Sequence, residues 1–159
     1  QAEWFNAAPS ADVTASSEFR DGNGILYPCR NIVDRQARIG GDSVIWIANE
    51  SNGAYVELRW PVPIEVRQFV LYGLTPKAAR KISVNDCKII LYYGGVEAGS
   101  ISSTGALSAA GKPVSLSPTK IDAARILITK SSGSFHKRAV AGLAEVETIA
   151  RLFPLQSSN

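Results

Sequence analysis

The feature that most constrains the fold of this chain is a succession of short segments in which apolar and polar residues alternate. Residues 54–60 place Val56, Leu58 and Trp60 on one face and charged residues on the other, the two-residue period of a half-buried strand. The same criterion predicts strands at 64–72, 88–93, 124–129 and 143–149, and weaker ones at 12–16, 44–48, 99–103 and 113–116. Only residues 30–34 have the pattern of a helical turn. The sequence therefore predicts an all-β antiparallel sandwich or barrel.

Length and composition indicate one globular domain. The chain has 159 residues, of which 45% are hydrophobic and 19% charged, which excludes disordered and collagen-like proteins. We expect a lead-in at residues 1–10, a single domain at 11–150 and a frayed tail or linker at 151–159, where the pattern is lost. The longest apolar runs, such as 89–93, fall far short of the ~18 residues of a membrane helix.

Three features favour a secreted protein. The chain begins at Gln1 and contains no Met, it has two cysteines, and Asn49-Glu50-Ser51 is a glycosylation sequon. In an oxidising compartment Cys29 and Cys87 could form a disulfide that pins a loop to a central strand, and we expect this bond. The alternative is a pair of buried free thiols, as in cytosolic proteins.

The residues give no sign of catalysis. His136 is the only histidine, and one histidine with two cysteines cannot complete a four-ligand zinc site. There is no Gly-x-Ser-x-Gly motif and no phosphate-binding glycine loop. Glu145 and Glu147 share one face of a predicted strand, the only paired carboxylates of note. We expect a non-enzyme; a small hydrolase would need an acid or a nucleophile beside His136.

The order of several short motifs resembles a known family. These motifs are Val13–Ser17, Asn31–Asp34, Ile45–Ile47, Tyr55–Trp60, Phe69–Tyr72 and Gly142–Glu147. The chain is similar over residues 11–149 to the discoidin family, also called coagulation factor V/VIII C-type or galactose-binding-like domains, which includes the family 32 carbohydrate-binding modules. The resemblance implies an eight-stranded jelly-roll β-sandwich, in agreement with the strands predicted from alternation.

The resemblance also implies a structural calcium ion. In family 32 modules the ion lies between an aspartate loop and the glutamate of the last strand, and the matching positions here are Asp34 and Glu145. Calcium takes about six to eight oxygen ligands, so backbone carbonyls would complete the site. Arg35 stands where the family usually has a glycine. The alternative is that Asp34 caps the turn and Glu145 pairs with an arginine.

Ligand binding is expected in loops at one end of the sandwich. The resemblance matches Arg80, Asn85 and Phe135 to the arginine, asparagine and aromatic residue of galactose-binding modules. A sugar needs a flat aromatic ring against its C–H face and donors for its hydroxyl groups. Phe135 could supply the ring, and Arg80, Lys81, Asn85 and His136 the polar contacts. The alternative places Phe135 in the core and leaves the basic residues merely solvated.

The charge distribution limits the classes of molecule that the chain is expected to bind. Residues 112–138 contain six Lys or Arg against one acid, Asp122, which would attract an anionic glycan or headgroup. A net charge of +3 without a basic and aromatic stripe disfavours nucleic acid. We expect a non-catalytic carbohydrate-binding module, part of a larger secreted protein, that binds an oligosaccharide or polysaccharide. The alternative is a membrane-surface or cell-adhesion domain that uses Ile25, Leu26 and Tyr27.

Overall fold

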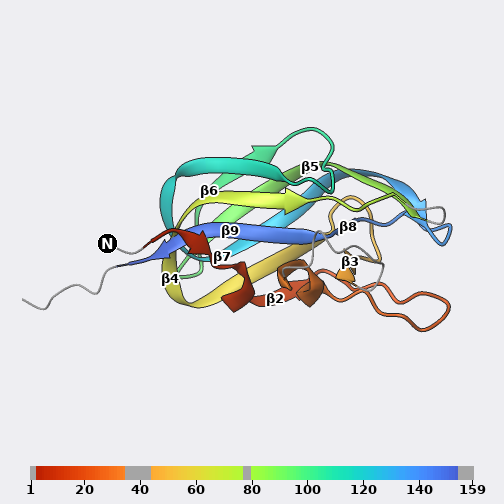
Figure 1. Ribbon diagram of the computed structural model, residues 1–159, viewed down its shortest axis with the longest axis horizontal. Coiled ribbons are helices and arrows are strands. Elements are labelled where there is room, and N and C mark those ends of the chain that lie inside the picture. Colours follow the sequence, from red (N-terminus) through yellow and green to blue (C-terminus); the bar gives the residue numbers. More distant parts are fainter. Residues whose placement is uncertain (1–2, 35–43, 77–79, 154–159) are drawn as a thin grey trace, which may run out of the picture.

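The computed structural model describes residues 3–34, 44–76 and 80–153, which form a two-layered antiparallel β-sandwich (Figure 1). Two long strands, β4 (Tyr55–Tyr72) and β7 (Lys112–Phe135), pair along their length and bend together, so that each contributes to both layers. One layer has the order β2–β4–β7–β5–β6 and the other the order β1–β9–β4–β7. The all-β antiparallel sandwich predicted from the sequence is confirmed.

The other elements are short. The remaining strands are β1 (Phe5–Asn6), β2 (Asp12–Ala15), β3 (Trp46–Ile47), β5 (Arg80–Tyr93), β6 (Val96–Ser103), β8 (Gly142–Leu143) and β9 (Glu145–Leu152). Two 3-10 helices, η1 (Ala8–Ser10) and η2 (Cys29–Val33), precede β3, and η2 is the helical turn expected at 30–34. No helix in the described residues is long and apolar enough to cross a membrane. β1 pairs with β9, so both ends of the described chain join the sheet.

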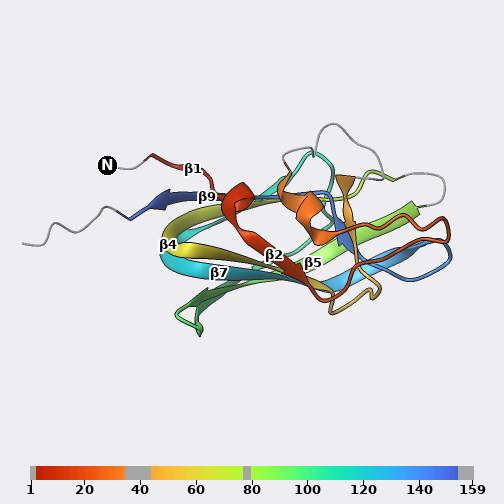
Figure 2. The same cartoon turned by 90° about the horizontal axis from the view of Figure 1, so that it is seen from below.

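Two prolines explain why one strand was predicted as two. The sequence predicts a break at Pro61 and Pro63, and the structure has a bent strand whose pairing with β7 shifts between Arg59 and Ile64. Proline cannot donate to the ladder, so it is tolerated where the pairing is interrupted. The bend carries β4 from one layer to the other, as the turned view of Figure 2 shows.

The core has two parts. The larger cluster fills the space between the layers and includes the fully buried Trp46, Phe69 and Ile126. The smaller cluster lies toward one end of the sandwich and contains Phe19, Tyr27, Ile45, Ile47, Tyr72, Leu74, Ile82, Phe135, Val140 and Ala144. This smaller cluster supports the loops in which ligand binding is expected.

The expected site residues Arg80, Lys81, Asn85 and Phe135 were assigned to loops, but residues 80–86 and 130–135 are strand. β5 begins at Arg80 and β7 continues to Phe135, with Lys81 opposite Ser134 and Ser83 opposite Ser132. The backbones approach closely at Gly133, where a Cβ atom would lie 1.6 Å from the carbonyl oxygen of Lys81. The serine-rich sequence hides this strand because its outward side chains are polar.

The expected disulfide between Cys29 and Cys87 is not formed, and both residues are buried free cysteines. Each belongs to the larger core cluster, and the Cys29 thiol donates to the carbonyl of Val13 at 3.6 Å. Burial raises the pKa of both thiols to about 12. The structure therefore agrees with the alternative prediction of two buried free thiols, which act as small apolar groups in the core.

Candidate functional site

The candidate site is built on a tight turn at the end of β7. Phe135 and Arg138 exchange two backbone hydrogen bonds of 2.9 and 3.0 Å, which leaves His136 and Lys137 as a two-residue loop. Both loop residues have positive φ angles, +50° and +64°. This is the type I′ conformation, in which Asn, Asp or Gly is strongly preferred. A histidine and a lysine therefore stand at positions where their side chains cost the backbone free energy.

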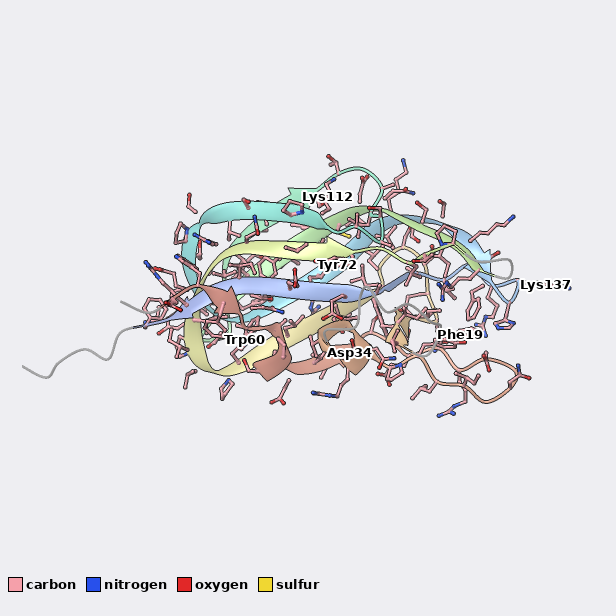
Figure 3. All side chains as sticks on the ribbon, in the orientation of Figure 1. Phe19, Asp34, Trp60, Tyr72, Lys112 and Lys137 are labelled. Carbon is pink, nitrogen blue, oxygen red and sulfur yellow. The ribbon has the colours of Figure 1, made fainter. Side chains whose placement is uncertain are left out.

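The imidazole of His136 is held against aromatic rings. It lies stacked on Phe19, with ring centroids 6.3 Å apart and 11° between the planes, and its centroid is 4.2 Å from that of Phe135. Phe19 and Phe135 are only 3% exposed, whereas the His136 side chain is 41% exposed. The ring is thus fixed from below and open to solvent above. Figure 3 labels Phe19 and Lys137 at this end of the molecule.

A second loop, residues 19–27, closes the site from the side. Its buried carboxylate is Asp21, which accepts hydrogen bonds from the backbone N–H groups of Asn23 and Ile25 at 2.9 and 3.0 Å. The other carboxylate oxygen accepts from the Tyr27 hydroxyl at 3.0 Å. The same oxygen lies 3.9 Å from Nε2 of His136. Asp21 therefore organises its own loop and faces the imidazole.

These contacts keep Asp21 charged. The backbone N–H of Ile25 lowers the pKa of the carboxyl most, against the opposing effect of burial, and Tyr27, Asn23 and His136 lower it further. Hydrogen bonds to an ionised carboxylate favour the charged form. The arrangement gives the imidazole a fixed negative neighbour and so a preferred orientation.

Exposed cations stand on the segments that flank the imidazole. We call the set Arg20, Lys81, Lys137 and Arg138 the basic rim; all four are exposed. The guanidinium of Arg138 lies 5.9 Å from the centroid of the Phe19 ring, and Arg20 donates to the carbonyl of Gly24 at 2.6 Å. Of the cations at 112–138, Lys137 and Arg138 lie at this turn, whereas Lys120 lies over the Tyr93 ring and Arg125 pairs with Glu57, so the expected positive end is only partly assembled here.

Arg80 and Phe135 are directly paired across β5 and β7, so the structure brings these two expected site residues together. Neither is placed to touch a ligand, because Arg80 is 2% exposed and Phe135 is 3% exposed. Arg80 donates to the carbonyl of Thr75 at 2.6 Å, and Phe135 belongs to the smaller core cluster. The expectation of an exposed Phe135 platform is wrong, because the ring forms the floor beneath His136.

The two other expected polar residues, Lys81 and Asn85, lie in different surroundings. Lys81 is exposed and joins the basic rim beside the tip of β7. Asn85 is half-buried at a bulge of β5, with its amide oxygen accepting from Ser83 at 3.0 Å and its amide nitrogen donating to Ser132 at 3.4 Å. It lies five residues along β5 from Arg80, or about 16 Å of extended strand. Asn85 is therefore not gathered around His136.

Asp34 and Glu145 were expected to hold calcium, and the fold places them on packed elements. Asp34 caps the C-terminal end of η2, which packs against β9, and Glu145 is the first residue of β9 and is buried. Carboxylate oxygens are among the ligands that calcium prefers. In the described ranges, no group of three or more His, Cys, Asp or Glu residues could hold a metal. Further ligands would have to be carbonyl oxygens. Figure 3 shows Asp34 well away from Lys137.

Sequence reasoning missed the roles of Phe19, Asp21 and Tyr27. The turn-forming run Asp21-Gly22-Asn23-Gly24 between two aromatic residues was the available signal, because aspartate readily caps its own turn. The same loop was considered for membrane insertion through Ile25, Leu26 and Tyr27. Tyr27 is buried, Leu26 is half-buried and only Ile25, at 46% exposure, is open to solvent.

No protein-family model matches the chain, and no curated protein sequence matches it. Several solved structures do match the chain in fold. A fucose-binding module of Streptococcus pneumoniae, SpX-3, is 21% identical with a TM-score of 0.67 over 91% of this chain and 96% of that one. The lectin domain of lectinolysin, complexed with Lewis B antigen, is 17% identical with a TM-score of 0.72 over 92% and 96%. The family 32 carbohydrate-binding module of NanJ from C. perfringens, complexed with galactose, is 16% identical with a TM-score of 0.70 over 94% and 99%. The chain has the discoidin, or galactose-binding-like, fold.

Proposed function

We propose that the chain is a non-catalytic glycan-binding module whose ligand is held at the His136 turn. The observation that carries the proposal is the strained type I′ turn, which holds an exposed imidazole on buried aromatic rings. Residues kept in a costly backbone conformation gather at functional sites. The structural neighbours bind fucose, Lewis B antigen and galactose according to their descriptions, which supports a sugar ligand.

The polar groups at the turn suit a saccharide. His136 offers a nitrogen donor or acceptor, and Arg138 offers guanidinium donors in a fixed fork. The imidazole ring and the exposed Ile25 supply flat and apolar surface for the C–H face of a sugar, which Phe135 cannot provide. The basic rim adds a positive potential that would favour a glycan with carboxylate or sulfate groups over an uncharged one.

The charged groups near His136 do not resemble a catalytic site. Asp21 already accepts three hydrogen bonds from its own loop, so its free electron pairs are largely used in structure. Its oxygen is 3.9 Å from the imidazole, beyond hydrogen-bond distance. The imidazole is therefore held by its ring contacts with Phe19 and Phe135 and not by a hydrogen bond to an acid, as a binding surface requires. We further propose that the chain acts outside the cell as one module of a larger protein, with Asn49 exposed and available to glycosylation.

A structural calcium ion held by Asp34 and Glu145 is also part of the proposal. It would tie η2 to the first residue of β9, which the packing of these two elements supports. The ion would be structural, because Asp34 lies well away from Lys137 of the His136 turn in Figure 3.

The test is a glycan array probed with the full chain, the His136→Ala variant and a control, Lys88→Ala. Lys88 is exposed on β5, outside the basic rim, so this control removes a charge without touching the turn. We expect the wild type and Lys88→Ala to recognise the same glycans and His136→Ala to lose them. Equal binding by all three proteins would refute the location of the site, and no binding by any of them would refute the function.

A further inference from the structure

A hollow lies on the outer face of the sheet, far from the His136 turn. It measures about 140 Å³ and is lined by Glu57, Arg59, Tyr92, Gly95, Asp122, Ala123 and Arg125. Twelve residues of β7, 124–135, lie between Ala123 and His136, or about 40 Å of extended strand. Figure 3 places Trp60, the neighbour of Arg59, toward the opposite end of the molecule from Lys137. The two sites cannot share one sugar unit.

The register of the strands explains the hollow. Arg59 on β4 pairs with Ala123 on β7, and Ala123 pairs with Tyr92 on β5, so a methyl group lies between two long side chains. In the next row along the sheet, Glu57 pairs with Arg125. The small residue forms the floor, and its neighbours on both sides form the walls. Cross-strand neighbours on one face stand about 5 Å apart, so the long side chains of Arg59 and Tyr92 leave a space above the short side chain of Ala123. This space is the hollow.

The polar walls are held rigidly. Glu57 is buried, and its two carboxylate oxygens accept from Nε of Arg59 at 2.7 Å and from Nε and Nη2 of Arg125 at 3.1 and 3.0 Å. The guanidinium of Arg125 also lies 4.0 Å from the centroid of the Tyr55 ring. Asp122 is fixed by accepting from the backbone N–H of Gly94 at 3.0 Å. Groups whose orientation is set before binding lose little entropy when a ligand arrives.

The charges of the hollow select the ligand class. Two guanidiniums, of Arg59 and Arg125, are balanced by two carboxylates, of Glu57 and Asp122, so the hollow does not favour an anion. It offers unused guanidinium donors, a carboxylate acceptor and the side of a tyrosine ring. A hydroxyl group both donates and accepts, so a polyhydroxylated ring satisfies donors and acceptors together.

We propose that this hollow is a second saccharide-binding site, specific for uncharged sugar units and independent of the His136 turn. It would let the module contact a long or branched glycan at two separate places. Two weak contacts on one glycan raise the overall affinity through effective concentration. The site does not depend on the function assigned to the turn, because no lining residue belongs to it.

The experiment is a titration of the ¹⁵N-labelled full chain followed by ¹H–¹⁵N correlation spectra. The probes are galactose, L-fucose, glucose, mannose, lactose and cellobiose, with glucuronate as the charged comparison. We expect at least one neutral probe to shift the amides of Tyr92, Gly95 and Ala123, with an affinity that does not change between low and high salt. Absence of these shifts with every neutral probe, or shifts only with glucuronate that vanish in salt, would overturn the proposal.

Variants separate the two sites. Arg59→Ala removes one wall while Glu57 keeps its contacts with Arg125, so no buried charge is stranded, and we expect the affinity of the hollow to fall about tenfold. Ala123→Leu should fill the notch, and Lys88→Ala serves as the control on the same sheet face. His136→Ala should leave the shifts at Tyr92 and Ala123 intact even if it abolishes those at the turn. Shifts at the hollow that persist in Arg59→Ala and Ala123→Leu, or that disappear in His136→Ala, would contradict an independent site.

Discussion

The imidazole of His136 is stacked on the Phe19 ring, 11° from parallel, although the two residues lie 117 positions apart in the chain. The contact joins the loop at 19–27 to the turn at the end of β7. Asp21 and Tyr27 belong to the first loop, and Lys137 and Arg138 to the second, so this ring pair, together with the contact of Phe19 with Phe135, fixes the polar groups of the two segments relative to each other. The predictions below follow from that arrangement.

Relief of the strained turn should stabilise the protein and remove its binding. Replacing His136 by Asn and Lys137 by Gly gives the preferred type I′ sequence, and we expect the free energy of unfolding to rise by about 1–2 kcal/mol. Urea unfolding measures the gain, and the glycan array measures the loss of binding. A variant that is more stable and binds normally would show that the turn is not the site.

Phe135→Ala should destabilise the fold severely. The ring is buried in the smaller core cluster, so we expect a loss of about 3–5 kcal/mol in unfolding free energy. Ile25→Ala, an exposed apolar residue of the adjacent loop, is the control and should change it by less than about 0.5 kcal/mol. A near-normal melting temperature for Phe135→Ala would restore the exposed platform that the sequence suggested.

Asp21 should make the stability depend on acid. Its pKa in the folded protein lies below the ordinary value of 3.8, chiefly because of the Ile25 N–H. A lowered pKa contributes stability above 3.8, and that contribution is lost as the pH falls through the folded-state value. The difference in unfolding free energy between wild type and Asp21→Asn should therefore be constant near neutral pH and shrink in acid. If the difference in unfolding free energy stays constant in acid, Asp21 does not make the stability depend on pH.

The cysteines should be unreactive until the protein unfolds. Both thiols are buried with a pKa of about 12, so little thiolate is present at neutral pH. Alkylation followed by mass spectrometry should label neither residue in native protein and both in urea without a reductant. Labelling that requires a reductant as well as urea would establish the disulfide that the structure lacks.

Calcium should raise the melting temperature if Asp34 and Glu145 hold the ion. Ligands that bind only the folded state stabilise it by an amount that grows with the logarithm of their concentration above the Kd. Melting in calcium and in chelator compares the two states, with Glu145→Gln and Asp34→Asn expected to lose the difference. An identical melting temperature in both solutions would refute the proposed calcium site.

The alternation of apolar residues predicted the sandwich and most strands because burial of one sheet face imposes a two-residue period. It did not reveal that β4 is continuous through Pro61 and Pro63, since the bend depends on pairing with β7. The burial of Arg80 was visible in principle, because it is in phase with Ile82 and Val84, whose side chains point inward. The polar run Ser131–Ser134 concealed the strand that carries Phe135 into the core. The stacking of His136 on Phe19 joins distant segments and could not be read from spacing.

The alternative of membrane binding makes a separate prediction. Among the three apolar residues considered for insertion, only Ile25 is exposed, and a single side chain with the basic rim gives weak attachment at most. Co-sedimentation with phosphatidylserine vesicles should show no binding at physiological salt. Retention on the vesicles that Ile25→Ala abolishes would favour the membrane-surface function instead.

The central claim is that the His136 turn binds glycan, and calorimetric titration of the best array ligand tests it most directly. Wild type and Lys88→Ala should give the same Kd, and His136→Ala should weaken binding at least about tenfold while its melting temperature stays near normal, because the side chain is 41% exposed. An unchanged Kd for a folded His136→Ala protein would contradict the account.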